Sequence, residues 1–170
     1  MLKNLSLRFD ALEDRILLRL VSDEGEQQLQ LTRRVCARWG HDLQQLVATS
    51  AQAPARLDAV AQTNLAAAHH QAMAAQATTY RETAPETPLP ALSPPQLVTG
   101  IACGRRHSDG RWLLRFTAQQ GRDWTVVLTS ETLHGLVDVF RAQVNIAQWA
   151  LPPMALEAVA TVQAGASPLH

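Results

Sequence analysis

The sequence has no long apolar run and only two cysteines. None of its apolar stretches approaches the roughly 20 residues that a membrane-spanning helix needs. The N-terminal residues alternate between polar and apolar side chains without the apolar core of a signal peptide, so we expect a cytoplasmic protein that is not attached to a membrane. Cys36 and Cys103 have neither CxxC spacing nor a neighbouring His cluster. This spacing predicts two small core side chains rather than a zinc site or a disulfide framework.

An excess of charge of either sign is also missing. The 170 residues include 15 Lys+Arg and 15 Asp+Glu, and Lys3 is the only lysine. Apolar residues make up 46% and charged residues 18% of the chain, a composition typical of a globular domain rather than of a disordered one. The length suits one main domain or two small ones. Proteins that bind nucleic acids normally have a basic excess, so the composition disfavours that class.

Motifs that would support catalysis are absent. The chain contains no GxSxG elbow, phosphate-binding loop, GxGxxG pattern or HExxH helix. Asp10, Glu13 and Asp14 could form paired carboxylates, but no nucleophile accompanies them and pairing with nearby arginines is favoured. His69 and His70 are adjacent on an expected helix and point about 100° apart, which does not suit one metal ion and favours two exposed residues. The sequence predicts a protein that is not an enzyme and that holds no metal or cofactor.

What the chain does contain is an internal repeat. The segment 14–20 matches 110–116, and Gly25 matches Gly121 at the same offset, whereas Leu31 and Thr32 match Leu128 and Thr129 one position later. The slip indicates one extra residue in the second copy, such as a β-bulge. Both copies continue into apolar residues at helical spacing. Each copy is therefore expected to form three strands and a helix.

Apolar residues alternate with polar ones in the expected strands, and this alternation predicts which side chains face the core. Thr32 and Thr129 stand where an N-cap hydroxyl would begin each helix, and Ser108-Asp109-Gly110 is typical of a hairpin turn. Apolar spacing and period also place the four tryptophans in the core rather than in a base-stacking set. The side chains expected to face inward on the strands are Leu5, Leu7, Phe9, Ile16, Leu18, Leu20, Trp112, Leu114, Phe116, Trp124, Val126 and Leu128.

These patterns predict an α+β fold made by tandem duplication of a βββα unit, with the two copies packed as a pseudo-dimer. The first unit spans residues 1–50 and the second spans 97–149. An Ala-rich helix (51–81) and a Pro-rich linker (82–96) connect them, and a partly disordered C-terminal segment (150–170) follows. A three-stranded unit buries little surface alone, so each unit is expected to need the other.

Two stretches carry a resemblance to known proteins. The run from Phe9 to Arg19, followed by Leu31-Thr32-Arg33-Arg34, resembles a pattern (FDAxEDRxLLR…LTRR) found in a family of proteobacterial hypothetical proteins. That resemblance implies a bacterial protein, but no activity, because none is known for the family. The expected curved sheet, followed by a helix after a Ser/Thr-containing turn, is also similar to PC4-like and Whirly-like proteins, which implies single-stranded nucleic-acid binding.

Arginines recur at equivalent places on one strand face of both copies, with a leucine between them. Such a face could bind a protein partner, or it could bind nucleic acid, since Arg pairs with phosphate and stacks on bases. It could also be solvated, with the arginines paired to carboxylates such as Asp10, Glu26 and Asp123. The candidate binding residues on this face are Arg15, Leu17, Arg19, Arg111, Leu113 and Arg115.

The first turn of the helix in the first copy holds basic residues, where the helix dipole favours acids. Thr32, Arg33 and Arg34, with Arg38 one turn on, could hold an anion such as a phosphate or a partner's carboxylate. Pairing of these arginines with the carboxylates of the preceding hairpin is the simpler explanation, and the candidates are Asp23, Glu24 and Glu26.

From the residues together we expect a non-catalytic adaptor or assembly protein that binds a protein partner through a pseudo-twofold sheet surface. The alternative is a single-stranded nucleic-acid-binding protein that uses the same face.

Overall fold

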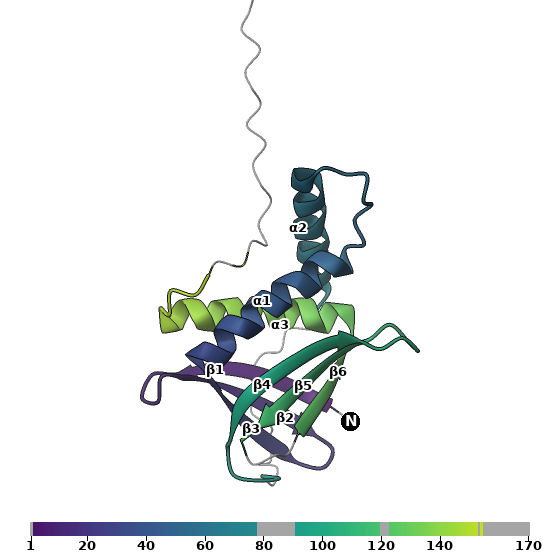
Figure 1. Cartoon of the computed structure of the whole chain (residues 1–170). Coiled ribbons are helices and arrows are strands. Elements are labelled where there is room, and N and C mark those ends of the chain that lie inside the picture. The colour runs from purple at the N-terminus through teal and green to yellow at the C-terminus, as the bar shows by residue number, and fades with distance from the viewer. Residues whose placement is uncertain (1, 78–90, 120–122, 153, 155–170) are drawn as a thin grey trace, which may run out of the picture.

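The computed structural model describes residues 2–77, 91–119, 123–152 and 154. These residues form an α+β fold with one six-stranded sheet and three helices. In chain order the elements are β1 (Leu2–Asp10), β2 (Arg15–Ser22), β3 (Glu26–Thr32), α1 (Arg33–Ser50), α2 (Ala59–Gln76), β4 (Gln96–Arg105), β5 (Trp112–Ala118), β6 (Asp123–Leu128) and α3 (Ser130–Ala147). Helices α1 and α3 lie across the same side of the curved sheet, and α2 projects away from it (Figure 1).

The strands follow one another in the sheet in chain order, from β1 at one edge to β6 at the other. Neighbours pair antiparallel except β3 and β4, which pair parallel through Leu29 with Gln96 and Gln30 with Leu97. Parallel strands need a long crossover connection, and α1 and α2 both lie between β3 and β4 in the chain. The parallel pair therefore joins the first three strands to the last three in one sheet.

The register of the first three strands recurs in the last three. Ile16 opposes Phe9 and Leu31, and Trp112 opposes Arg105 and Leu128. The register also shifts at corresponding places, between Leu2 and Asn4 in β1 and between Val98 and Gly100 in β4. The β5–β6 pairs continue from Trp112 to Thr117 without a shift, so the expectation of a bulge in that part of the second copy is wrong. The connection from β5 to β6, where an extra residue can be accommodated, includes residues 120–122, which lie outside the described part of the chain.

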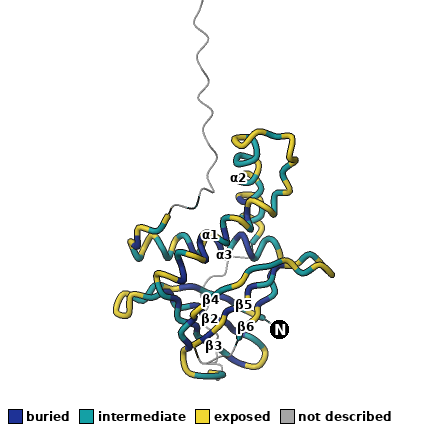
Figure 2. The backbone as a smooth tube through the Cα atoms, viewed as in Figure 1, coloured by how far each residue is buried: buried dark blue, intermediate teal, exposed yellow. Residues whose placement is uncertain are grey.

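The hydrophobic core lies between the sheet and the two helices α1 and α3. Helix α1 packs against β4 and, less extensively, β3, whereas α3 packs against β1 and, less extensively, β6. The fully buried Trp39 makes edge-to-face contacts with Phe116 in β5 and with Phe140 in α3, at ring-centroid distances of 5.8 and 4.9 Å. Gly40 in α1 lies against the Phe140 ring of α3, where a Cβ would be in van der Waals contact at 3.4 Å. Figure 2 shows the buried residues gathered where the helices meet the strands.

The inward-facing residues expected from the alternation are confirmed, with two only partly buried. Phe9 and Trp124 are half-buried and pack at the margin of the core. Thr32 and Thr129 cap α1 and α3, and their hydroxyls accept hydrogen bonds from the Val35 and Thr132 amides, as predicted.

Gly110 has φ of +70° in the hairpin that joins β4 to β5, which explains why a glycine stands at this turn. Of the two cysteines, Cys36 is buried and Cys103 half-buried, and both are free thiols.

Helix α2 begins after Asp58, whose carboxylate accepts from the Ala61 amide, and it lies within the expected Ala-rich segment. The Pro-rich segment expected at 82–96 falls mostly on residues 82–90, which lie outside the described residues, and its end already belongs to β4. Most of the C-terminal segment expected at 150–170 also lies outside them. Within the described part of the chain, no helix has the length and apolar character needed to cross a membrane.

Candidate functional site

The candidate binding residues of β2 and β5 lie on the outer face of the sheet, away from α1 and α3. Ile16, Leu18 and Leu114 point into the core and are fully buried, so the residues between them point to the opposite face. Along β2 and β5 in Figure 2 the buried colour alternates with the half-buried or exposed colours, as this arrangement requires. The residues placed on it, or at its edge just before β5, are Arg15, Leu17, Arg19, Arg111, Leu113 and Arg115.

On this face the arginine that follows the leucine in each half, Arg19 or Arg115, is paired with a carboxylate on the next strand. In the first half Arg19 Nη2 donates to Glu26 Oε2 at 2.6 Å, with only 19% and 16% of the side chains exposed. The hydrogen bond from Arg19 lowers the pKa of Glu26, and burial opposes that shift. In the second half Arg115 Nε donates to Asp123 Oδ2 at 2.7 Å. The expected cross-strand pairing with Glu26 and Asp123 is therefore present.

The arginine that precedes the leucine in each half, Arg15 or Arg111, also has a polar partner. Arg15 Nη1 donates to Gln30 Oε1 at 2.7 Å and lies 3.6 Å from Glu13 Oε2. Arg111 Nε lies 3.6 Å from Asp109 Oδ2. The pKa of Asp109 falls to about 2, mainly because Arg106 donates a hydrogen bond to this carboxylate. Each of these four arginines thus has an acidic neighbour, which reduces the positive potential that they offer to a phosphate.

The two leucines between the arginines have different neighbours. Leu17 is paired with Arg8 on β1 and with Gln30 on β3. Leu113 is paired with Gly104 on β4 and with Val127 on β6. We call Arg8, Leu17 and Gln30 the first outer row, and Gly104, Leu113 and Val127 the second outer row. The first outer row is polar on both sides of its leucine, whereas the second is apolar and has an open space beside Gly104, where a Cβ would meet no atom within 4 Å.

The first turn of α1 presents two exposed arginines. Thr32 caps the helix, and Arg33 and Arg34 point into solvent with no acidic residue in that turn. The expected pairing with Asp23, Glu24 or Glu26 is wrong: Asp23 pairs with Lys3 and Glu26 with Arg19, and Glu24 precedes β3, at the opposite end of that strand from the helix. The length of β3, roughly 20 Å at 3.3 Å per residue, separates those carboxylates from the helix start. Among the described residues neither Arg33 nor Arg34 has an ion-pair partner.

The carboxylates of the β1–β2 hairpin have structural roles. Asp10 Oδ1 accepts from the backbone amides of Leu12 and Glu13, at 2.9 and 3.3 Å. Asp14 adopts φ of +50°, and its Oδ1 accepts from Trp149 Nε1 at 2.6 Å. Glu13 accepts from Gln30 Nε2 at 3.1 Å. These contacts hold the hairpin to β3 and to the segment after α3.

One buried polar cluster was missed by the sequence analysis. His70, expected to be exposed, is only 3% exposed, and its Nδ1 lies 2.7 Å from Nδ1 of the fully buried His134. His70 Nε2 lies 2.9 Å from Asp138 Oδ1, and His134 Nε2 lies 3.1 Å from the Ser50 hydroxyl. Burial, followed by the neighbouring His70 and His69 rings, lowers the pKa of His134 to about 4. A histidine within the apolar stripe of 133–137 was the available signal, since a buried polar side chain needs a partner.

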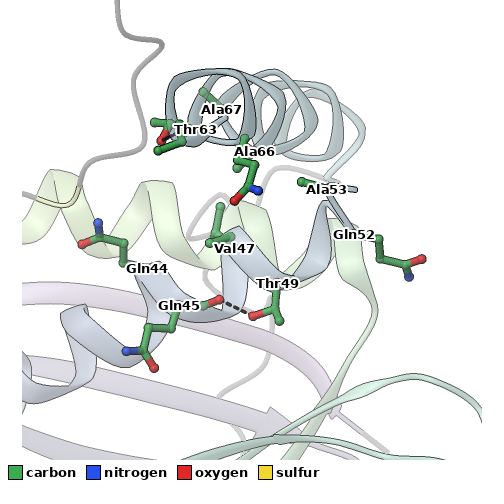
Figure 3. A pocket seen from close by; sticks show the side chains of 12 residues that line it. Gln44, Gln45, Val47, Thr49, Gln52, Ala53, Thr63, Ala66 and Ala67 are labelled. Atoms are coloured by element: carbon green, nitrogen blue, oxygen red, sulfur yellow. Dashed lines mark hydrogen bonds between the residues drawn. The ribbon is translucent and has the colours of Figure 1, made fainter. Parts of the chain in front are cut away.

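Two open grooves lie near these elements. The first, about 700 Å³, runs between α1 and α2 and is lined by glutamine, threonine and small apolar side chains such as Gln44, Gln45 and Ala66 (Figure 3). Among the described residues no titratable side chain lines it. The second, about 560 Å³, lies between β6 and the ends of β1 and β2, with Arg111 and Glu24 at its wall. Within the part of the chain that the structure describes, no group of three or more His, Cys, Asp or Glu side chains is placed to hold a metal ion.

Comparisons with protein-family models, curated proteins and solved structures gave no match for this chain.

Proposed function

We propose that the chain is a tandem duplication of a βββα unit whose two copies pack as a pseudo-dimer. The shared strand register and the equivalent register shifts in β1 and β4 support this proposal. Helices α1 and α3 are both 18 residues long and both follow a threonine N-cap. The packing is reciprocal, because α1 packs on the first strand of the second unit and α3 packs on the first strand of the first unit. Each helix thus covers the other unit, which explains why neither unit would be complete alone.

The function that the outer face supports best is that of a non-catalytic adaptor or assembly protein with a protein partner. The observation that carries this proposal is the second outer row. Leu113 and Val127 lie side by side, half-buried, next to a glycine that leaves the surface open. A protein partner can bury such an apolar strip and place its own apolar side chain beside Gly104. Arg111 and Arg115, already bound to acids, would form the polar rim of this contact.

The ion pairs favour a protein partner over nucleic acid. To bind phosphates, Arg19 and Arg115 would have to exchange Glu26 and Asp123 for a phosphate, and the carboxylates left behind would repel the nucleic-acid backbone. A protein partner requires no such exchange, because it can contact the apolar side chains while the arginines stay paired with their carboxylates. The second candidate partner is a single-stranded nucleic acid. It is supported by Arg33 and Arg34, which are exposed and have no ion-pair partner in the described ranges.

The test of the first candidate uses the space beside Gly104. The substitution Gly104→Arg would reproduce the arrangement of the first outer row, where Arg8 flanks Leu17. The tagged full-length chain is isolated from the cells that produce it, and proteins that accompany it are quantified by mass spectrometry. We expect Gly104→Arg to reduce a specific companion at least tenfold, and the control Arg8→Lys to leave it unchanged. Companions equally abundant with both variants would overturn the proposal.

The second candidate is tested by fluorescence anisotropy of a labelled single-stranded oligonucleotide. Binding that weakens steeply with salt, and that is lost in Arg33→Ala, Arg34→Ala, would replace the protein-partner proposal. We expect no binding at physiological salt.

A further inference from the structure

Helix α2 is attached to the rest of the molecule by very few buried side chains. Among its 18 residues only Ala67 and His70 are buried. The helix packs against α3 and, less extensively, against α1. The side chain of Ala67 is a single methyl group, so it buries only a small apolar area. The polar contacts of His70 therefore carry a large share of the attachment of α2.

A continuous chain of hydrogen bonds runs through His70. Its Nε2 faces the Asp138 carboxylate at 2.9 Å and must donate, so a neutral His70 accepts at Nδ1. His134 Nδ1, 2.7 Å away, then donates to it, which leaves His134 Nε2 as an acceptor 3.1 Å from the Ser50 hydroxyl; the single hydrogen of that hydroxyl can instead go to the Val47 carbonyl at 2.7 Å. With both rings neutral, the facing nitrogens of the two rings and the contact of His70 with Asp138 are satisfied, and the contacts of the two histidines join α1, α2 and α3.

We propose that the His70–His134 pair is a pH-operated clamp that holds α2 against α3 at neutral pH and releases it in mild acid. Only one hydrogen fits between two ring nitrogens 2.7 Å apart. When both rings are protonated, each Nδ1 carries a hydrogen, so the central hydrogen bond is lost and two positive charges face each other. The release of α2 separates the rings, returns them to water and opens the groove between α1 and α2 that Figure 3 shows.

The charged groups around the pair set the direction of the effect. On α2, the His69 ring lies edge-on to His134 at 5.2 Å between centroids, so its protonation also opposes a charge on His134. On α3, Asp138 and Glu131 favour a charged His134, but Asp138 is already bonded to His70 and has Arg141 3.9 Å away. On α1 the neighbour is the uncharged Ser50, which can turn its hydroxyl to the Val47 carbonyl at 2.7 Å.

The pH window follows from the difference between the attached and the released state. In the attached state the pKa of His134 is about 4, whereas a released ring titrates near its ordinary value of 6.5. The attachment is at full strength above about pH 6.5 and weakens as pH falls toward 4, because the released state binds the additional proton there. A single proton changes the attachment equilibrium by at most about tenfold per pH unit.

Hydrogen exchange of the full-length chain, measured by mass spectrometry at pH 7.5 and pH 5.0 and corrected for the intrinsic exchange rate, tests the clamp. We expect protection of the α2 amides to fall at least tenfold at pH 5.0, while β2 and β5 keep theirs. Unchanged protection in α2, or a parallel loss in β2 and β5 that signals global unfolding, would overturn the proposal.

Two variants separate the clamp from other effects of acid. In His134→Asn the side-chain amide can still donate to His70 but does not titrate, so α2 should keep the same protection at both pH values. The matched control is His107→Asn, at an exposed residue of the β4–β5 hairpin, which should behave as wild type. A pH response that persists in His134→Asn would contradict the clamp. If His134→Asn does not fold, the wild-type comparison of α2 with β2 and β5 still decides.

Discussion

The two outer rows occupy corresponding places in the sheet yet present different surfaces. In the first outer row Leu17 lies between the polar side chains of Arg8 and Gln30, whereas in the second Leu113 lies between Gly104 and Val127. The strand register around both leucines is the same. The two halves thus share the strand register and the inward-facing apolar side chains, whereas their outward side chains differ. This difference explains why we assign the docking surface to the second half alone.

The largest effect is expected from substitutions of the inward-facing leucines, which test whether the two halves of the core are equivalent. Leu18 and Leu114 stand at corresponding positions, and both are fully buried. Leu18→Ala and Leu114→Ala should each lower the free energy of unfolding by about 3 kcal/mol, because each leaves a cavity in the same core. Denaturant-induced unfolding measures both, with the exposed Leu12→Ala as the control that changes little. A cost for one variant less than half that of the other would argue against equivalent halves.

A second comparison concerns the outer rows directly. Leu113→Gln should weaken binding of the companion protein about tenfold or more, equivalent to about 1.4 kcal/mol, because the apolar centre of the contact becomes polar. Leu17→Gln should change binding less than twofold, since polar side chains already surround Leu17. Titration calorimetry with the purified companion gives both values. Equal losses would mean that both halves take part in the contact.

The two cross-strand ion pairs should differ in their contribution to stability. Arg19 and Glu26 are mostly buried, so Arg19→Ala should cost about 1 kcal/mol. Arg115 is 63% exposed, and Arg115→Ala should cost less than about 0.5 kcal/mol, because solvent screens the pair. Chemical unfolding at pH 7 measures both costs.

The same pair gives a prediction for pH. The pKa of Glu26 in the folded chain is lowered from 4.5, so the pair stabilises the fold fully above about pH 4.5 and loses its effect as pH falls through the lowered value. The difference in unfolding free energy between wild type and Arg19→Ala should therefore shrink in acid. A difference that stays constant down to pH 3 would show that the stabilisation does not depend on the Glu26 carboxylate.

The smallest expected effect is on the stability of Gly104→Arg. The added Cβ would meet no atom within 4 Å, and Gly104 is paired with the outward-facing Leu113, so we expect the unfolding free energy to change by less than about 0.5 kcal/mol. Gly135→Ala is the contrasting substitution, because its added methyl would lie only 2.7 Å from Cβ of Ala77. A thermal unfolding series should show a measurable loss for Gly135→Ala alone. A large loss for Gly104→Arg would invalidate its use as a probe of binding.

Local patterns in the sequence predicted much of the fold. Alternation identified the inward faces of β1, β2, β5 and β6, and the threonines marked the starts of α1 and α3. The arginine pairs with Glu26 and Asp123 were expected among the alternatives, because opposite charges on neighbouring strands attract. All of these features depend on residues close together in the chain or on a single strand pair.

Features that depend on distant parts of the chain were not predicted. The parallel pairing of β3 with β4 and the contact of His70 with His134, 64 residues apart, arise from the packing of whole elements. The same packing buries His70, which by its position on an Ala-rich helix was expected to face solvent. The difference between the outer rows also required the strand register, since Gly104 and Leu113 become neighbours only when β4 and β5 pair.

The most direct test of the docking surface compares the two outer rows in one experiment. A photo-crosslinking amino acid replaces Leu17 in one full-length variant and Leu113 in another, and both are irradiated in the cells that produce the protein. Our account predicts one discrete crosslinked companion from position 113, absent when Gly104→Arg is added, and none from position 17. Crosslinking from position 17 alone, or from neither position, would contradict the assignment of the partner surface to the second half of the sheet.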